Sequence, residues 1–199
     1  MLVESHGGNN ETCPGTAFVV GSRTLFTAGH IANSGVKCVY YDDERLVPDK
    51  THYLNDTKLG LDVAVLEFAS NRFSLSRPMQ VSFRLPELGE QVAALGFPTV
   101  PKRDSAIVMH IGHVESLTMN FYQNCRFIQT TFQSGGGLSG SPLVDESGSV
   151  IGIMTETVFL KGMDGQVPSR PYGQAMPVEY AAILRRFPKI DPSFVCPSV

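Results

Sequence analysis

Short runs of β-branched, aromatic and aliphatic residues recur along the whole chain, and each is bounded by Gly, Pro, Asn or Asp. This pattern constrains the fold more than any other feature, because short strands separated by turns are typical of an all-β sandwich or barrel. The runs that we predict to be strands are residues 16–20, 37–41, 62–68, 91–96, 106–111, 126–132, 142–144 and 149–155. Residues 178–187 have helical periodicity and flanking prolines, and we predict an α-helix there.

A proline-containing stretch at residues 77–89 separates two strand-rich halves. We therefore predict two small β-barrels, the first over residues 12–76 and the second over residues 90–176. Residues 1–11 are expected to form an N-terminal extension, and residues 188–199 a C-terminal tail. The length of 199 residues is sufficient for one compact unit or for two closely packed halves.

The composition excludes several classes of protein. Hydrophobic residues make up 42% of the chain and charged residues 18%, which argues against a disordered acidic or basic protein. The net charge of −3 argues against a nucleic-acid partner. No apolar run approaches the roughly 18 residues that a membrane-spanning helix requires, so we expect no membrane partner. The first residues lack a basic segment followed by an apolar one, so we expect no secretory signal.

The cysteines are widely scattered and favour no metal site. Cys13, Cys38, Cys125 and Cys196 include no C-x-x-C pair and no tight cluster with histidine, so we expect no zinc. Four cysteines allow three disulfide pairings, between which the sequence does not choose. We interpret them as ordinary thiols of a reducing compartment, which favours the cytoplasm, although two glycosylation sequons leave the compartment open.

The segment GGGLSGSPLV at residues 135–144 is the strongest candidate for chemistry. A serine on a tight glycine-flanked turn exposes its hydroxyl and can direct backbone N–H groups at one point, although such a stretch can also be only a loop. A serine nucleophile requires a nearby base, usually an imidazole that a carboxylate orients. All histidines precede Ser139, and no aspartate precedes residue 42. The order left for His30 is therefore His, Asp, Ser.

Motifs in this order resemble those of the trypsin-like serine proteases, and most closely the protease domain of the HtrA/Deg branch. GTAFVVGSRTLFTAGH at residues 15–30 is similar to the segment that ends at the catalytic histidine. LDVAVLEF at residues 61–68 is similar to the strand that carries the catalytic aspartate. FIQT at residues 127–130, GLSGSP at residues 137–142 and SGSVIGI at residues 147–153 resemble the nucleophile region. Several motifs in the right order are far more specific than any one of them.

The resemblance implies the chymotrypsin fold, with two packed six-stranded antiparallel β-barrels and a C-terminal α-helix, and a peptidase domain over residues 12–187. It also implies a serine endopeptidase that acts on polypeptides without a cofactor. His30 would be the general base, Asp62 would orient it, and Ser139 would be the nucleophile. The N–H groups of Gly137 and Ser139 would form the oxyanion hole.

The resemblance further implies where a substrate binds. The family pairs its substrate as an added strand with the edge that aligns with Thr155, Glu156 and Thr157. The residues that align with its primary pocket are Gln133, Ser134, Met154, Thr157 and Gly173. None of them is acidic, so we predict a preference for a small or medium apolar side chain, or a polar one read by Ser134 or Gln133, and not for Lys or Arg. Glu156 is predicted to favour basic residues further along the substrate.

The resemblance also implies a dependence on pH. We expect activity at neutral to mildly alkaline pH, and a decline as His30 becomes protonated near the reference histidine pKa of ~6.5.

The chain departs from the family pattern in several places. Leu138 replaces the aspartate that pairs with a newly cut N-terminus in trypsin and chymotrypsin, so we expect no activation by such a cut. Ser141 stands where the family usually has a second glycine, and we interpret it as a packing substitution. The glycines at residues 135–137 make the loop cheap to rearrange, and we hypothesise that it is disordered or misformed until a substrate or partner orders it. Residues 188–199 are too few to form a PDZ domain.

Other residues have simpler interpretations. Asp42 and Asp43 lie in a charged turn and are expected to be solvated. His110 and His113 are three residues apart on a predicted strand, so they point to opposite faces and are expected to be satisfied or exposed, not to hold a metal. Two alternative functions stay open: a catalytically inactive protease-fold module for binding or scaffolding, and a processing protease with one dedicated partner.

Overall fold

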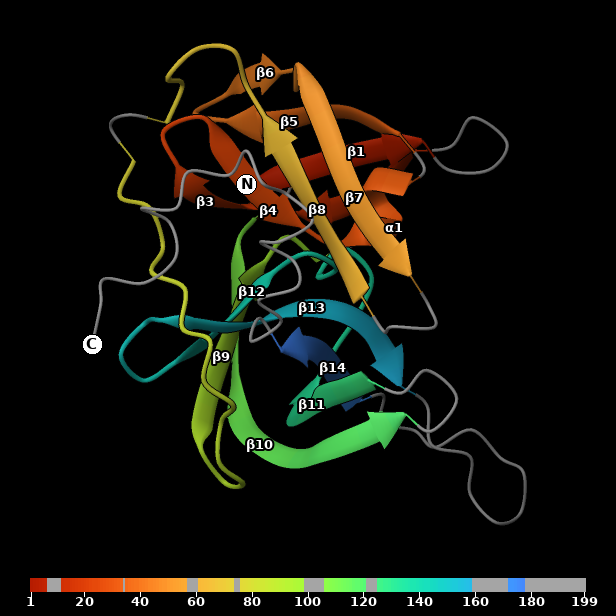
Figure 1. Cartoon of the computed structure of the whole chain (residues 1–199), viewed down its shortest axis with the longest axis vertical. Helices are drawn as coiled ribbons and strands as arrows, with labels where there is room; N and C mark the ends of the chain where they lie inside the picture. The colour runs from red at the N-terminus through yellow and green to blue at the C-terminus, as the bar shows by residue number, and fades with distance from the viewer. Residues whose placement is uncertain are drawn as a thin grey trace.

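The protein is almost entirely β, as the sequence predicts (Figure 1). The computed structural model describes residues 1–6, 12–33, 35–56, 61–73, 76–98, 106–120, 125–158 and 172–177. The predicted helix at residues 178–187 and the tail at residues 188–199 lie outside these ranges. Within the described ranges no helix is long and apolar enough to cross a bilayer.

The first half of the chain forms two four-stranded antiparallel sheets, whereas the resemblance implies a six-stranded barrel there. One sheet has the order β2-β1-β5-β6, with β1 at Leu2–His6, β2 at Thr12–Thr16, β5 at Val36–Tyr41 and β6 at Glu44–Leu46. The other has the order β3-β4-β8-β7, with β3 at Phe18–Gly21, β4 at Thr24–Thr27, β8 at Leu61–Glu67 and β7 at Lys50–Asp56. Val3 and Val39 of the first sheet and Leu25 and Leu66 of the second belong to one buried apolar cluster.

Strand β1 is part of the N-terminal extension that the sequence predicts, but it lies in the middle of a sheet. It pairs with β2 on one side and with β5 on the other. Val3 and Ser5 are buried and alternate with partly exposed residues, as the pleat of a half-buried strand requires. The segment was not predicted as a strand because LVESH has only two apolar residues, and they are adjacent. Strand β1 is therefore stabilised by pairing with β2 and β5, and its local sequence does not indicate a strand.

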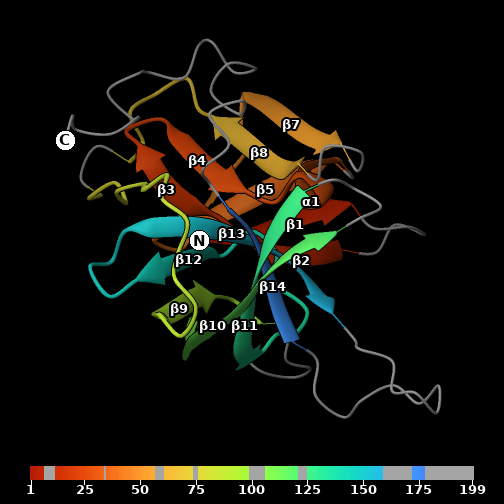
Figure 2. The same cartoon turned by 60° about the horizontal axis from the view of Figure 1, so that its bottom comes forward.

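The second half forms a closed six-stranded antiparallel barrel, as the resemblance implies (Figure 2). The strand order around the barrel is β10-β11-β14-β13-β12-β9. The strands are β9 at Gln91–Gly96, β10 at Val108–Asn120, β11 at Cys125–Gln133, β12 at Pro142–Asp145, β13 at Val150–Val158 and β14 at Tyr172–Pro177. Ile128, Leu143 and Ile151 are fully buried in the core cluster of this barrel.

A third apolar cluster joins the two halves. Phe18, Phe26 and Val65 of the first half pack in one buried cluster with Ile153 and Met176 of the second. The connection between the halves passes along this interface, where Met79 N–H donates to Val19 O at 2.9 Å and Ser82 N–H donates to Val150 O at 2.8 Å. The ends of the first-half strands are therefore held against the second barrel.

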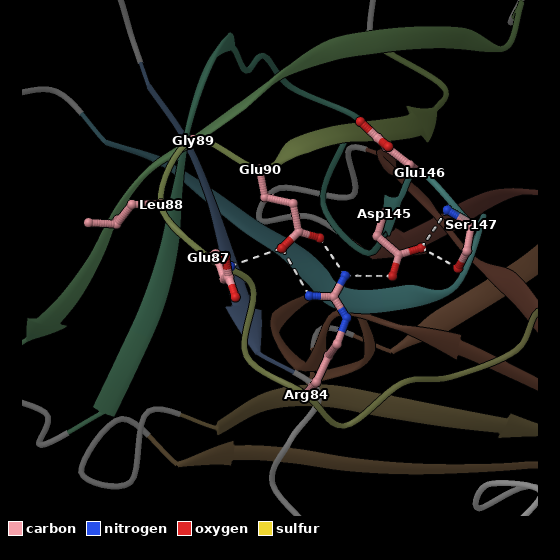
Figure 3. A pocket seen from close by; sticks show the side chains of 8 residues that line it. All are labelled: Arg84, Glu87, Leu88, Gly89, Glu90, Asp145, Glu146 and Ser147. Atoms are coloured by element: carbon pink, nitrogen blue, oxygen red, sulfur yellow. Dashed lines mark hydrogen bonds and ion pairs between the residues drawn. The ribbon is translucent and has the colours of Figure 1, made fainter. Parts of the chain in front are cut away.

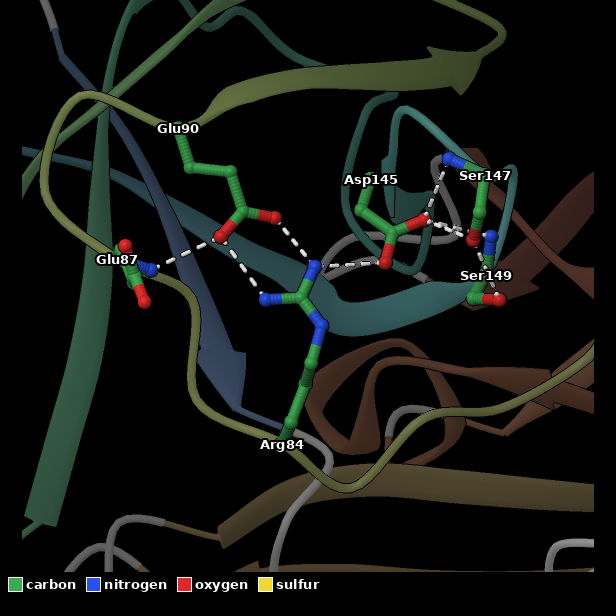
Figure 4. Close-up of polar contacts among 6 residues, drawn as sticks. All are labelled: Arg84, Glu87, Glu90, Asp145, Ser147 and Ser149. Carbon is green, nitrogen blue, oxygen red and sulfur yellow. Dashed lines mark hydrogen bonds and ion pairs between the residues drawn. The ribbon is translucent and has the colours of Figure 1, made fainter. Parts of the chain in front are cut away.

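Arg84 attaches the same connection to the second barrel (Figure 4). Its guanidinium donates to Glu90 from both terminal nitrogens and to Asp145 Oδ2 at 2.7 Å. The hydrogen bond from Arg84 lowers the pKa of Glu90 below its ordinary value. Burial raises the pKa of Asp145, but hydrogen bonds from Ser147, Arg84 and Ser149 more than offset it and leave that pKa lowered. Asp145 thereby holds both Arg84 and the turn between β12 and β13.

Candidate active site

His30 and Asp62 are joined by two hydrogen bonds. His30 lies in the short helix α1 (Gly29–Asn33), which the sequence did not predict and which follows directly after β4. Asp62 is the second residue of β8, and β8 pairs with β4. The main-chain N–H of His30 donates to Asp62 Oδ1 at 2.7 Å, and the ring Nδ1 lies 2.8 Å from Oδ2. A carboxylate at Nδ1 favours the tautomer with its proton on that nitrogen.

The loop at residues 134–141 between β11 and β12, which we call the nucleophile loop, carries Ser139. Gly140 N–H donates to Met154 O at 2.7 Å, and Met154 N–H donates to Ser141 O at 2.9 Å, so the loop extends the pairing of β12 with β13. Leu138 is 1% exposed, so the residue that replaces the family's aspartate is an apolar anchor. An apolar side chain is buried at this position without the cost of an unpaired charge.

Backbone contacts bring the nucleophile loop against the segment that leads to His30. Thr16 N–H donates to Ser139 O at 2.8 Å. Gly140 has a φ of +84°, and a Cβ there would lie 2.2 Å from Thr27 Oγ1 and 2.8 Å from Ala28 N. Asp62 reaches the same seam, where its N–H donates to Met176 Sδ at 3.2 Å. The three predicted triad residues therefore lie on elements that meet where the two halves join.

The Ser139 hydroxyl donates to the main-chain carbonyl of Thr155 at 3.1 Å. The sequence predicts that this proton faces His30, and a serine hydroxyl has only one proton to donate. Thr155 lies where the β13–β14 register shifts between Met154 and Glu156, which marks a β-bulge. A bulge redirects the backbone, and here the Thr155 carbonyl faces the nucleophile loop. The structure therefore shows the Ser139 hydroxyl bonded to the main chain of the predicted substrate strand.

Beyond this point one edge of β13 has no partner strand among the described residues. Strand β12 pairs with β13 only as far as Ile153, and the nucleophile loop continues that pairing to Met154. On the opposite edge, β14 pairs with β13 from Gly152 to Val158. The backbone of Thr155, Glu156 and Thr157 thus presents an unpaired edge next to Ser139, which is a geometry that can accept an extended peptide.

The residues predicted to form the primary pocket come from three neighbouring strands. Gly173 of β14 pairs with Thr157 of β13, and a Cβ on Gly173 would lie 3.2 Å from Met154 Cε. Gln133, which is exposed, pairs with Tyr172 at the end of β11, and the buried Ser134 follows it. The fold therefore places these residues around the end of β11.

The remaining candidate residues differ in their exposure and in their hydrogen bonds. Asp42 and Asp43 are exposed residues of a tight turn, as predicted. His113 is exposed, but His110 is not satisfied as we expected, because its Nε2 is buried without a hydrogen-bond partner while its ring lies 5.9 Å from that of Phe132. Cys13 and Cys38 are free thiols, and the side chains of Cys125 and Cys196 lie outside the described part of the chain.

Two further features of the described ranges bear on what the site can do. No group of three or more His, Cys, Asp and Glu side chains in those ranges is arranged to hold a metal ion.

A surface pocket is present near Arg84, but it contains none of the predicted site residues (Figure 3). Its lining residues are Arg84, Glu87, Leu88, Gly89, Glu90, Asp145, Glu146 and Ser147. The charged side chains at its centre are those of Arg84, Glu90 and Asp145, which form the ion pairs described above.

The chain is similar to known peptidases in sequence and in fold. The family described as trypsin-like peptidase domain matches residues 15–153. The active form of the Rv3671c protease from M. tuberculosis has a TM-score of 0.71 and 18% identity, over 96% of this chain and 81% of that chain. The HtrA-type protease AlgW with a tripeptide has a TM-score of 0.68 and 20% identity, over 93% of this chain and 58% of that chain. HL collagenase has a TM-score of 0.69 and 11% identity, over 96% of this chain and 93% of that chain. No curated protein matches the sequence.

Proposed function

The chain belongs to the trypsin-like peptidase family, and we propose on that premise that it is a serine endopeptidase. The observation that carries the proposal is the pair of hydrogen bonds between His30 and the Asp62 carboxylate, whose Oδ1 accepts the main-chain N–H and whose Oδ2 lies at the ring Nδ1, across the seam from the loop with Ser139. Such a carboxylate stabilises an imidazole that must accept and return a proton. The unpaired edge of β13 supports a polypeptide as the substrate.

In the proposed mechanism, Ser139 Oγ attacks the carbonyl carbon of a peptide bond as its proton passes to His30 Nε2. The new Oγ–C bond leaves the former carbonyl oxygen negatively charged, and the N–H groups of Gly137 and Ser139 would stabilise it. No backbone carbonyl among the described residues accepts a hydrogen bond from either group. The C–N bond then breaks as His30 protonates the leaving amine. Water hydrolyses the acyl-enzyme by the same route, which returns the proton to Ser139.

The hydrogen bond from Ser139 to Thr155 has to change before the attack. We infer that a main-chain N–H of the substrate strand takes the Thr155 carbonyl, and that rotation of the Ser139 hydroxyl then directs its proton to His30. The rotation exchanges one hydrogen bond for others, so its cost is on the order of 1 kcal/mol. A crystal structure with a peptide aldehyde is expected to show an inhibitor N–H at Thr155 O. Ser139 Oγ still on that carbonyl, with the inhibitor bound at the β13 edge, would contradict this step.

The proposal is tested by incubating the protein with fluorescein-labelled casein and with short fluorogenic peptides. The unchanged chain should cleave at least one of them, and Ser139→Ala should lose that activity. Ser147→Ala, which alters an exposed serine on the β12–β13 turn, is the matched control and should keep it. Cleavage of peptides but not of casein would favour a protease with a dedicated partner. No cleavage by any form would favour an inactive binding module, and equal cleavage by Ser139→Ala would contradict the nucleophile.

A further inference from the structure

Thr16 holds the nucleophile loop at two carbonyl groups. Its hydroxyl donates to Gly137 O at 2.9 Å, and its main-chain N–H donates to Ser139 O at 2.8 Å. Thr16 is only 2% exposed and lies at the end of β2, in the first half of the molecule, whereas the loop belongs to the second. One residue therefore joins the halves at both ends of the segment that would form the oxyanion hole.

The direction of the hydroxyl hydrogen bond is fixed by a third group. The N–H of Phe97, just after β9, donates to Thr16 Oγ1 at 3.0 Å. Because that lone pair is occupied, the single proton of the hydroxyl is directed at Gly137 O. The chain of Phe97 N–H, Thr16 O–H and Gly137 C=O is buried, where aligned hydrogen bonds reinforce one another.

Glycines on both sides make room for this arrangement. A Cβ on Gly96 would lie 2.9 Å from Thr16 Oγ1 and 2.1 Å from Ser141 Oγ. A Cβ on Gly140 would lie 2.2 Å from Thr16 O, which also accepts a hydrogen bond from Thr27 Oγ1 at 2.7 Å. Thr16 is thus enclosed by backbone that approaches closely from the second half, and it has little freedom to move.

Gly137 itself is in the left-handed region, with a φ of +90°. Glycine adopts this conformation at no steric cost, so the loop has no strong intrinsic preference for it. Leu138 N–H donates to Gly135 O, but only at 3.4 Å. The hydrogen bond from Thr16 is therefore a specific restraint on a segment whose three glycines would otherwise leave it free to rearrange.

We propose that Thr16 is a positioning residue for the oxyanion hole, which acts by fixing the Gly137 carbonyl. This inference rests on the proposed function. The Thr16 hydroxyl would not touch the substrate; it fixes the peptide group between Gly137 and Leu138, which lies between the two peptide groups that carry the Gly137 and Ser139 N–H donors. Its loss should therefore weaken binding of the transition state and leave binding of the ground state nearly unchanged.

The test compares Thr16→Val, Thr16→Ser and Ser5→Ala with the unchanged chain. Valine keeps the shape and the main-chain N–H but removes the hydroxyl, and serine restores the hydroxyl. Ser5→Ala is the matched control, because Ser5 is 1% exposed and its hydroxyl also donates to a main-chain carbonyl, Cys13 O at 3.1 Å, in the sheet that contains β2. Turnover is measured with an Nα-acyl-alanine p-nitrophenyl ester, and inhibition with the corresponding peptide boronic acid.

Thr16→Val is expected to lower kcat about 10- to 100-fold while KM changes less than about twofold. The Ki of the boronic acid should rise by the factor by which kcat/KM falls, because the boronate oxygen occupies the oxyanion site. Thr16→Ser should regain most of the activity, and Ser5→Ala should keep it. If Thr16→Val turns over at the unchanged rate, or Thr16→Ser is as poor as Thr16→Val, the inference is wrong. If the unchanged chain has no Ser139-dependent turnover, the proposed function fails, and this inference with it.

A second measurement does not depend on the stability of Thr16→Val. In a crystal structure of the unchanged chain with the boronic acid, Thr16 Oγ1 should stay within hydrogen-bond distance of Gly137 O. The N–H groups of Gly137 and Ser139 should both point to the boronate oxygen. A Gly137 carbonyl turned away from Thr16 in that complex would overturn the inference.

Discussion

Asp62 makes one contact that the sequence predicts, with the ring of His30, and a second that it does not predict, with the main chain of His30. Its position at the start of an apolar strand indicates a partnered carboxylate, because an unpartnered charge would be costly to bury there. The structure adds that Oδ1 accepts the main-chain N–H of His30 while Oδ2 faces the ring. The side chain of Asp62 is 18% exposed and that of His30 is 40% exposed, so the pair is open to solvent on the imidazole side.

Asp62→Asn should abolish most of the activity without unfolding the protein. The amide oxygen can still accept the His30 N–H, but the NH₂ group then faces Nδ1 and favours the tautomer with its proton on Nε2. That tautomer cannot accept the proton of Ser139, and the corresponding loss in a serine protease is about 10⁴-fold in kcat. The measurement is ester turnover, with circular dichroism as the check on folding. A folded variant with more than about a tenth of the normal kcat would contradict the role of Asp62.

At the scale of elements, the nucleophile loop depends on close packing at Gly140. Gly140 and Gly148 have nearly the same φ, +84° and +80°, but only Gly140 has neighbours, since nothing lies within 4 Å of a Cβ on Gly148. Gly148→Ala should therefore cost only the conformational strain of about 1–2 kcal/mol. Gly140→Ala should cost about 3 kcal/mol or more and abolish turnover, because the added carbon meets Thr16 O and Thr27 Oγ1. Equal unfolding free energies in urea for the two variants would contradict this packing.

The connection between the halves gives a prediction about pH and stability. The pKa values of Glu90 and Asp145 are both lowered in the folded protein, so their contribution to stability is present above their ordinary values and is lost as the pH falls through the folded values. Arg84→Met should therefore cost most near neutral pH and progressively less below about pH 4.5. The size should be about 1 kcal/mol or less, because the Arg84 side chain is 44% exposed and its charge is screened.

The measurement is thermal unfolding of Arg84→Met and of the unchanged chain between pH 7 and pH 3. Arg72→Met is the matched control, because Arg72 lies 3.9 Å from Glu44 and both side chains are more than half exposed. Such an exposed pair should contribute almost nothing at any pH. A difference between Arg84→Met and the unchanged chain that stays constant across this range would show that the two carboxylates do not depend on Arg84.

Across the whole molecule, the features that could be predicted from sequence are those with a local signal. The second barrel, the order of His30, Asp62 and Ser139, and the turn at Asp42 follow from strand patterns, motif order and turn chemistry. Strand β1 was missed because its order comes from pairing on both edges, and α1 because five residues are too short for a helical pattern. The roles of Thr16 and of the Thr155 carbonyl could not be predicted, since both rest on main-chain groups brought together from different halves.

The proposal that most needs a direct test is that the three residues act as one site. The most direct measurement is mass-spectrometric mapping of the residue that a fluorophosphonate probe modifies, which forms an Oγ–P bond as fluoride leaves. We predict one adduct, on Ser139, that is lost in His30→Ala and retained in Ser141→Ala, which removes the neighbouring hydroxyl of the same loop. An adduct on another serine, or labelling of Ser139 that persists unchanged in His30→Ala, would contradict the proposed site.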